Sequence, residues 1–184
     1  MSSETIAYTG LLCGHLAGFT TGLRKLPAEQ WDWTPHIAAP TARILATHAW
    51  QWLQCDRQHI NTPDASQHTR IPDPPTEPSA MCDALDRENA AWKDMISRMT
   101  PEFLDEKRSQ FNQNEMTVRD FICHMIQNTI YKHGQFTTLF FALEHDGSEV
   151  YAAPFPNPIY EELFGPRTPE PPDITETDPS CRGE

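Results

Sequence analysis

The stretch that decides the fold is TVRDFICHMIQNTIYKHGQFTTLFFAL, residues 117–143. Its pattern repeats at steps of three and four residues, which predicts one long helix with a single packing face. That face comprises Phe121, Met125, Asn128, Lys132, Gln135, Leu139 and Leu143. An amide or ammonium buried without a partner costs at least roughly a few kcal/mol, so the polar residues must pair or line a cavity. We therefore expect Asn128, Lys132 and Gln135 to mark a functional site.

Three further stretches have the spacing of amphipathic helices, at residues 4–26, 41–60 and 79–99. A proline-rich connection without that spacing, residues 61–78, separates the second stretch from the third. Side chains on each apolar stripe need other helices to pack against. Four long amphipathic helices with a long second connection predict an all-α fold, a four-helix bundle.

Several short signals mark where these helices begin. Thr117 and Asp120 have the spacing of a capping box, in which each side chain accepts a hydrogen bond from the other residue's backbone. Ser3 and Ser79 are candidate N-caps for the first and third helices.

Between the long helices, Trp31 and Trp33 are costly to expose, and we expect them to plug one end of the core. Residues 100–107 predict a short helical turn followed by a polar link.

The C-terminal part of the chain changes in composition. Residues 157–165, NPIYEELFG, have the start and stop signals of a short helix. The acidic, Pro-rich tail from 166 to 184 has little apolar content and is expected to be disordered. We therefore predict one bundle domain over residues 1–165, followed by this tail.

Composition excludes several classes of partner. The chain has 14 basic and 26 acidic residues, a formal charge of -12, and no Lys/Arg cluster that could follow a phosphate backbone. The first residues lack the charged and apolar regions of a secretory signal, and no run approaches about eighteen uninterrupted apolar residues. We expect a cytoplasmic protein that binds neither nucleic acid nor membrane.

The cysteines predict reduced thiols. Their number is odd, they are widely spaced, and they form no C-x-x-C pair that would indicate zinc or redox chemistry. Four of the five lie in helical patterns, where a free cysteine usually acts as a small apolar side chain. The five are Cys13, Cys55, Cys82, Cys123 and Cys181.

Two stretches resemble the signature segments of the DinB-like superfamily, which includes YfiT-type thiol transferases and mycothiol-dependent enzymes. They are WDWTPHIAAPTARILATHAWQWLQ, residues 31–54, and TVRDFICHMIQNTIYKHGQFTTL, residues 117–139. The matches are W-x-W-x-P, the central His48, the T-V-R-D start, and Y-x-x-G-Q at Tyr131, Gly134 and Gln135. The resemblance covers roughly the first 165 residues and implies an up-down-down-up bundle.

The resemblance also implies a divalent metal held by three histidines, one on the second helix and an H-x-x-x-H pair before G-Q. His48 matches the first position, whereas Asn128 and Lys132 stand at the other two. An amide is a poor transition-metal ligand and an ammonium repels a cation. We therefore expect no resident metal. The alternative is a weak zinc, nickel or manganese site that uses His48 and His124.

Lys132 supports a metal-independent interpretation. Its ammonium could replace the positive charge of the metal, with His48 as proton donor or acceptor. Asn128, Gln135, Trp52 and His124 would then bind the substrate. In the competing structural interpretation, Lys132 reaches solvent and pairs with a glutamate, while His48 and Asn128 bond to each other in a filled core. His124 would then be an ordinary core or rim histidine.

Three functions remain open from the sequence. The first, which we favour, is an enzyme that transforms a small organic molecule without a metal through His48 and Lys132. The second is a divalent-metal-dependent thiol transferase or hydrolase of the DinB/YfiT type. The third is a non-catalytic, dimeric binding scaffold. Apolar helix surfaces and the resemblance are consistent with a homodimer.

Overall fold

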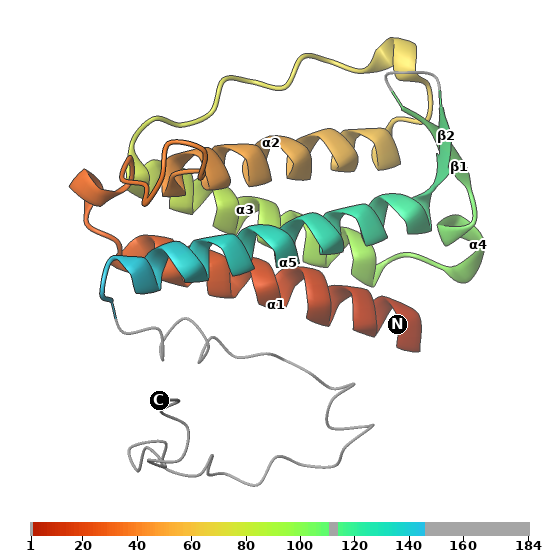
Figure 1. The fold of residues 1–184 in the computed structure, drawn as a ribbon. Coiled ribbons are helices and arrows are strands. Elements are labelled where there is room, and N and C mark those ends of the chain that lie inside the picture. Colours follow the sequence, from red (N-terminus) through yellow and green to blue (C-terminus); the bar gives the residue numbers. More distant parts are fainter. Residues whose placement is uncertain (1, 111–113, 146–184) are drawn as a thin grey trace, which may run out of the picture.

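Four long helices carry the fold of the computed structural model, which describes residues 2–110 and 114–145 (Figure 1). They are α1 (Ser3–Lys25), α2 (Ala42–Asn61), α3 (Pro78–Ser97) and α5 (Val118–Ala142). Helix α1 packs against α3 and α5, and α2 packs against the same two helices. The all-α four-helix bundle predicted from the sequence is confirmed.

Contacts between the helices define their directions. An ion pair joins the first turns of α1 and α5, where Arg119 Nε donates to Glu4 Oε1 at 2.6 Å. Asp56, late in α2, meets His124, early in α5, so these two helices are antiparallel. A further ion pair joins the end of α1 to the start of α3. The order is therefore up-down-down-up, as the resemblance implied.

The core is apolar and aromatic. Trp92 of α3 is fully buried, and its Nε1 donates to the backbone oxygen of Leu53 at 3.1 Å. Trp31 is also buried, so it plugs the end of the core as expected. The expectation that Trp33 also lies there was wrong: Trp33 is 36% exposed. The backbone N–H of Arg43 donates to the backbone oxygen of Trp31, and this hydrogen bond holds Trp31 against α2. Trp33 is two residues further along the chain and takes no part in it.

Helix start signals were predicted with mixed success. The capping box at α5 is confirmed: Thr117 N donates to Asp120 Oδ2 at 3.0 Å, and Asp120 N donates to Thr117 Oγ1 at 3.1 Å. Helix α1 is capped by Ser2 instead of Ser3. Helix α3 begins at Pro78 without a side-chain cap, so Ser79 lies inside the helix and does not cap it. Proline suits the first helical position because its fixed φ is already helical.

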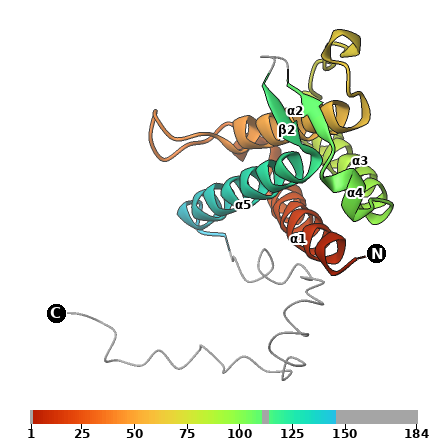
Figure 2. The same cartoon turned by 90° about the vertical axis from the view of Figure 1, so that its right-hand side faces the viewer.

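The connections carry short elements. Two single turns, η1 (Ala28–Gln30) and η2 (Ala65–Gln67), lie before and after α2. Helix α4 (Pro101–Leu104) matches the predicted turn, but the expected polar link instead contains β1 (Lys107–Ser109) and β2 (Glu115–Thr117). These strands pair antiparallel, and Figure 2 views the molecule from the side that carries them. Segments this short have too few residues to show a period.

A buried arginine explains why the hairpin lies at this end of the bundle. Arg108 of β1 is 5% exposed, and its Nε donates to the backbone oxygen of Ile60 at 2.9 Å. Its Nη2 donates to Glu106 Oε2 at 2.8 Å. The last carbonyls of a helix have no partner within the helix, so Arg108 closes the end of α2.

The predicted helix at 157–165 and the tail at 166–184 lie outside the described residues. Within the part that is described, no helix combines the length and the apolar character needed to cross a membrane.

The packing face of α5 is shifted from the predicted stripe. Phe121, Met125 and Leu139 are buried as expected, but Asn128, Lys132 and Gln135 are only half-buried. The fully packed line instead includes Thr129, His133 and Phe136. Helix α5 packs against both α1 and α2. The residues midway between these two contacts face the core, whereas the polar trio lies to one side of them, nearer solvent.

His133 illustrates the cost of a polar group on that centre line. It is 8% exposed, and its Nδ1 lies 3.2 Å from Nδ1 of His15 on α1. Burial and the neighbouring His15 lower the pKa of His133 to about 4. The two rings therefore pack as neutral groups at neutral pH, because a second positive charge here would have no water around it.

We predict that His133→Gln reduces the sensitivity of the fold to acid. The pKa of His133 is about 4 in the folded protein and 6.5 ordinarily, so between these values only the unfolded chain takes up the proton. Stability therefore falls as the pH falls. Between pH 7 and pH 5 the parent should lose up to about 2 kcal/mol more unfolding free energy than the variant in urea titrations. Equal losses would contradict this account.

Candidate functional site

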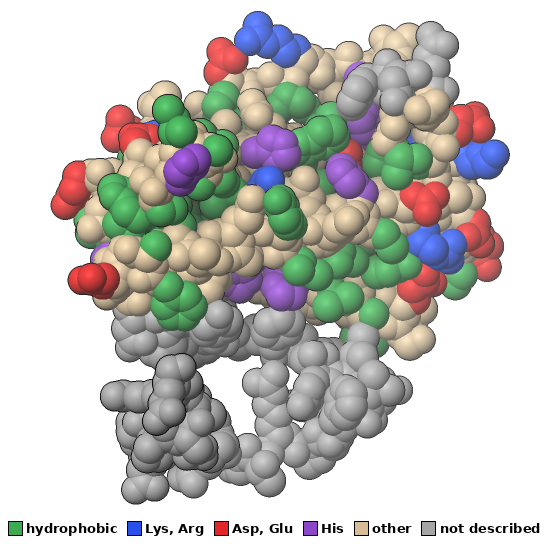
Figure 3. Space-filling model, in the orientation of Figure 1, with side chains coloured by type: hydrophobic (Ala, Val, Ile, Leu, Met, Phe, Trp, Pro, Cys, Tyr) green, Lys and Arg blue, Asp and Glu red, His purple; other side chains and the backbone are tan. Residues whose placement is uncertain are grey.

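Two lines of polar side chains face each other across the seam between α2 and α5. On α2 the line is His48, Trp52 and Asp56, and on α5 it is His124, Asn128 and Lys132. Both lines advance in steps of four residues, which keeps each on one side of its helix. Histidines and a basic side chain gather over this seam in the space-filling view (Figure 3). Because the helices are antiparallel, Asp56 meets His124 at one end of the seam.

A buried carboxylate orients His124. Asp56 is 1% exposed, and Nδ1 of His124 donates to its Oδ2 at 2.6 Å. This hydrogen bond raises the pKa of His124, because the carboxylate stabilises the imidazolium form. With Nδ1 engaged, the second nitrogen Nε2 is the one available for proton transfer. The pair is an Asp–His dyad.

Asp56 was not predicted from the sequence as a site residue. One signal was available: Asp56 lies eight residues after His48 and four after Trp52, on the same line of α2. Nothing in the sequence placed His124 opposite to it, because that contact depends on the offset between two helices.

Trp52 joins the two ends of the seam. Its Nε1 donates to Nε2 of His48 at 2.9 Å, and its ring meets that of His124 edge-on at a centroid distance of 5.2 Å. The side chain of Trp52 therefore lies between the two imidazoles, as a wall of the site. The indole N–H holds His48 in a defined orientation.

Lys132 places a positive charge at the same seam. It is half-buried, and burial lowers the pKa of its ammonium group. Its Nζ lies 5.2 Å from the ring centroid of Tyr131. Burial first, then the charges of Lys132 and His124, lower the pKa of His48. Within residues 2–110 and 114–145 Lys132 forms no ion pair, so the glutamate partner of the structural interpretation is not found there.

The hollow at the seam is open to solvent. It has a volume of about 310 Å³ and is lined by His124, Gln127, Asn128 and Tyr131. Asn128 Oδ1 and Gln135 Oε1 are buried without a hydrogen-bond partner among the described residues. Among the described residues, His48 is exposed and apolar side chains fill the bundle centre, so His48 does not line the enclosed cavity that was expected. The site is a groove at the edge of the bundle.

An apolar hollow continues from this groove toward α1. Its volume is about 520 Å³, and it shares Gln127 and Tyr131 with the polar hollow. Its other lining residues are Tyr8, Leu11, Cys123, Ile126 and Ile130. A molecule with a polar head and an apolar body would find both kinds of surface side by side.

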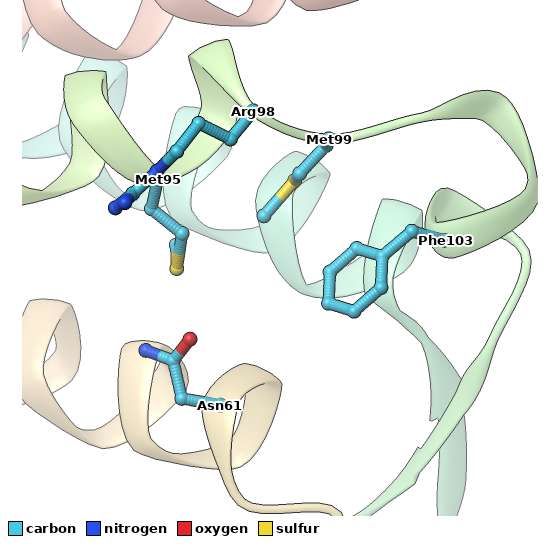
Figure 4. Close-up of a pocket in the computed structure, with 5 residues that line it drawn as sticks. All are labelled: Asn61, Met95, Arg98, Met99 and Phe103. Atoms are coloured by element: carbon cyan, nitrogen blue, oxygen red, sulfur yellow. The ribbon is translucent and has the colours of Figure 1, made fainter.

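A third hollow, of about 200 Å³, lies where α2 and α3 end (Figure 4). Met95, Met99 and Phe103 point there toward Asn61, and the remaining lining residue is Arg98. Arg98 already pairs with Asp94 of the previous turn. The hollow offers no acid, base or nucleophile, so we do not connect it with catalysis.

The cysteines that the structure describes differ in burial. Cys13 and Cys82 are buried, and burial raises the pKa of each thiol to about 11, as expected for small apolar side chains. Cys123 is exposed, contrary to that expectation, because its side of α5 faces away from the core. Cys55 is half-buried, and Cys181 lies outside the described residues.

Cys55 belongs to a cluster on the last turns of α2. The ligand atoms of Cys55, Asp56 and His59 all lie within 4.8 Å of one another. Burial alone would lower the pKa of His59, but Asp56 and then Cys55 raise it to about 9. This cluster was not predicted from the sequence, because it contains no C-x-x-C pair.

Comparison with known proteins identifies the family. A sequence model of the DinB superfamily matches residues 15–136, which include all of α2, α3 and the seam residues of α5. The chain belongs to the DinB superfamily. A solved structure with this fold is YfiT from Bacillus subtilis, described as a probable metal-dependent hydrolase with an unusual four-helix bundle topology. The TM-score is 0.61 at 12% identity, covering 79% of this chain and 91% of YfiT. No curated protein matches the chain.

The residues of this DinB protein do not fit a three-histidine metal centre. His48 is retained, but Asn128 and Lys132 stand where the resemblance puts the second and third histidines. The charge of Lys132 contributes to lowering the pKa of His48, so this ammonium is close enough to act on the one histidine that is retained. An ammonium and a dication held close together repel each other. We therefore assign no chemical step to a metal at this position.

We predict that Asn128→His combined with Lys132→His creates divalent-metal affinity at His48. Two imidazoles one helical turn apart can reach one cation, and His48 would supply the third. Titration calorimetry with Zn²⁺ should show a binding event that is absent from the parent and is lost again on His48→Gln. No gain over the parent would mean that these three residues do not converge.

Proposed function

We propose that this protein is a metal-independent acid–base enzyme that acts on a small anionic molecule at the seam between α2 and α5. The proposal rests mainly on the 2.6 Å contact between His124 Nδ1 and the buried Asp56, next to a hollow that can hold a ligand. It retains the interpretation favoured by the sequence and adds His124 as the base.

His124 is suited to accept a proton at Nε2. Asp56 fixes the ring and stabilises the imidazolium that forms when the proton arrives. The proton would come from an acidic C–H of the substrate, or from a water or thiol that attacks it. His48, held by Trp52, would be the second group able to donate or accept a proton.

Lys132 would stabilise the negative charge that this proton transfer creates. An ammonium that is half-buried interacts more strongly with an anion than one in bulk water does. The amide groups of Asn128 and Gln135 would orient the substrate, because their buried oxygens have no partner in the part of the chain that the structure describes. The neighbouring apolar hollow would accept the rest of the molecule.

Two other functions remain as competing proposals. A divalent-metal-dependent thiol transferase or hydrolase would agree with the description of YfiT as a probable metal-dependent hydrolase. A dimeric scaffold would use the apolar hollow between α1 and α5 for contact and leave the seam without chemistry. Sedimentation analysis of the oligomeric state tests the homodimer that we continue to propose. We also retain the proposal of a cytoplasmic location.

The experiment uses the full chain in EDTA with short-chain carboxylic acids, esters and thioesters as probes. Binding is measured by thermal shift, and hydrolysis or exchange of C–H protons in D₂O is measured by proton NMR. We predict that His124→Gln lowers turnover of an accepted probe by about 10²–10⁴-fold. Lys132→Met should weaken binding of the acids by roughly tenfold or more, since a charge-assisted bond is lost.

His36→Gln, which alters an exposed histidine outside the seam, is the matched control and should change neither quantity. Turnover that requires added metal would support the metal-dependent alternative. The absence of both saturable binding and turnover would support the scaffold, and either result contradicts our proposal.

A further inference from the structure

We propose that Cys55, Asp56 and His59 form a binding site for a thiophilic divalent cation, with zinc as the expected ion. This inference goes beyond the proposed function and does not depend on it. It concerns the inner side of the last turns of α2, not the position where the resemblance places a metal.

The distances fit a small cation. Asp56 Oδ1 and His59 Nδ1 are 3.6 Å apart, and Cys55 Sγ and His59 Nδ1 are 3.9 Å apart. With Zn–S near 2.3 Å and Zn–N and Zn–O near 2.0–2.2 Å, a tetrahedral site separates its ligand atoms by roughly 3.3–3.7 Å. These two separations need only a small contraction, whereas Cys55 and Asp56, whose ligand atoms lie within 4.8 Å, need up to about 1 Å of side-chain movement.

Burial supplies a second, independent argument. Asp56 is 1% exposed, and within the described part of the protein its Oδ1 accepts no hydrogen bond, because Nδ1 of His59 at 3.6 Å lies beyond hydrogen-bond distance. A buried carboxylate oxygen needs a partner, because desolvation of the charge is expensive. The other oxygen, Oδ2, is already bound by His124. A cation between the three side chains would satisfy Oδ1 directly.

The three ligands come from one continuous helix. Cys55 and His59 are four residues apart and Asp56 is three before His59, so all three project from neighbouring turns. No movement between helices is needed to assemble the site. A thiolate, an imidazole and a carboxylate together are a ligand set that zinc prefers.

Neighbouring groups hold the ligands in place. The ring of His59 packs between Phe121 and His68, at centroid distances of 5.3 and 4.8 Å. His124 fixes Asp56 from the other side at 2.6 Å. Partners of this kind orient metal ligands and typically contribute about 10–100-fold in affinity.

The proposed site is separate from the position of His48. His48 precedes Asp56 by eight residues, which is about 12 Å along a helix axis. A cation at Cys55 therefore need not lie near Lys132. The two positions can be distinguished by separate substitutions on α2.

The test uses Co²⁺ as the probe on the full, reduced chain. Cobalt bound to a thiolate gives a charge-transfer absorption in the near ultraviolet, and its visible bands report tetrahedral coordination. We expect both in the parent, with displacement by one equivalent of Zn²⁺. Cys55→Ser should abolish the charge-transfer band and weaken Zn²⁺ binding at least roughly tenfold.

Two variants are controls. Cys123→Ser removes an exposed thiol from α5, and His48→Gln removes the residue retained at the family's metal position; both should keep the cobalt spectrum. His59→Gln gives an independent reading and should lose tetrahedral coordination while circular dichroism shows an intact helical fold. A parent without the charge-transfer band, or a band that survives Cys55→Ser, overturns the proposal. Neither readout involves turnover, so failure here leaves the acid–base proposal standing.

Discussion

The structure of the seam depends on one buried charge, the carboxylate of Asp56. It lies at the interface of α2 and α5 with 1% of its surface exposed, and it faces His124 on one side and His59 on the other. A carboxylate in such a place is stable only if polar partners replace the water it has lost. This requirement fixes the offset between the two helices and the orientation of His124. The candidate chemistry follows from that orientation.

The basic side chains near the seam make separate contacts. Arg57, next to Asp56, turns to α3 and binds Glu88 with two hydrogen bonds of 2.9 Å, so it does not compete for Asp56. Lys132 lies at the other end of the seam. A chain with a net charge of -12 thus keeps a lysine and histidines around its groove. Our proposal of an anionic ligand rests on this local charge, which opposes the overall charge of the protein.

By the resemblance, Asn128 and Lys132 stand in place of the second and third histidines, and the proposed function gives this exchange a chemical reason. Asn128 and Lys132 occupy one side of α5 together with His124, and Asn128 lines the same groove as His124. Replacing a metal by an ammonium retains positive charge but removes the ability to polarise water as a Lewis acid. A general base is then needed to activate a nucleophile or to take a proton from carbon. His124 with Asp56 supplies such a group.

The sequence was sufficient for the parts of the structure that local periodicity determines. The four helices, the capping box at Thr117 and the burial of Trp31 follow from spacing and from side-chain type. The Asp56–His124 contact, the hairpin closed by Arg108 and the burial of His133 do not, because each depends on how distant segments are offset. For the same reason the predicted face of α5 was shifted by one residue. The polar trio, predicted to line an internal cavity, lies instead at an open edge.

The most direct test of the account is the tautomer of His124, measured by long-range nitrogen–proton NMR correlation at a pH where the ring is neutral. The account predicts a proton on Nδ1, held by Asp56, and an unprotonated Nε2 whose resonance shifts when a small carboxylic acid binds. A proton on Nε2, or a ring that does not respond to any bound acid, would contradict the account.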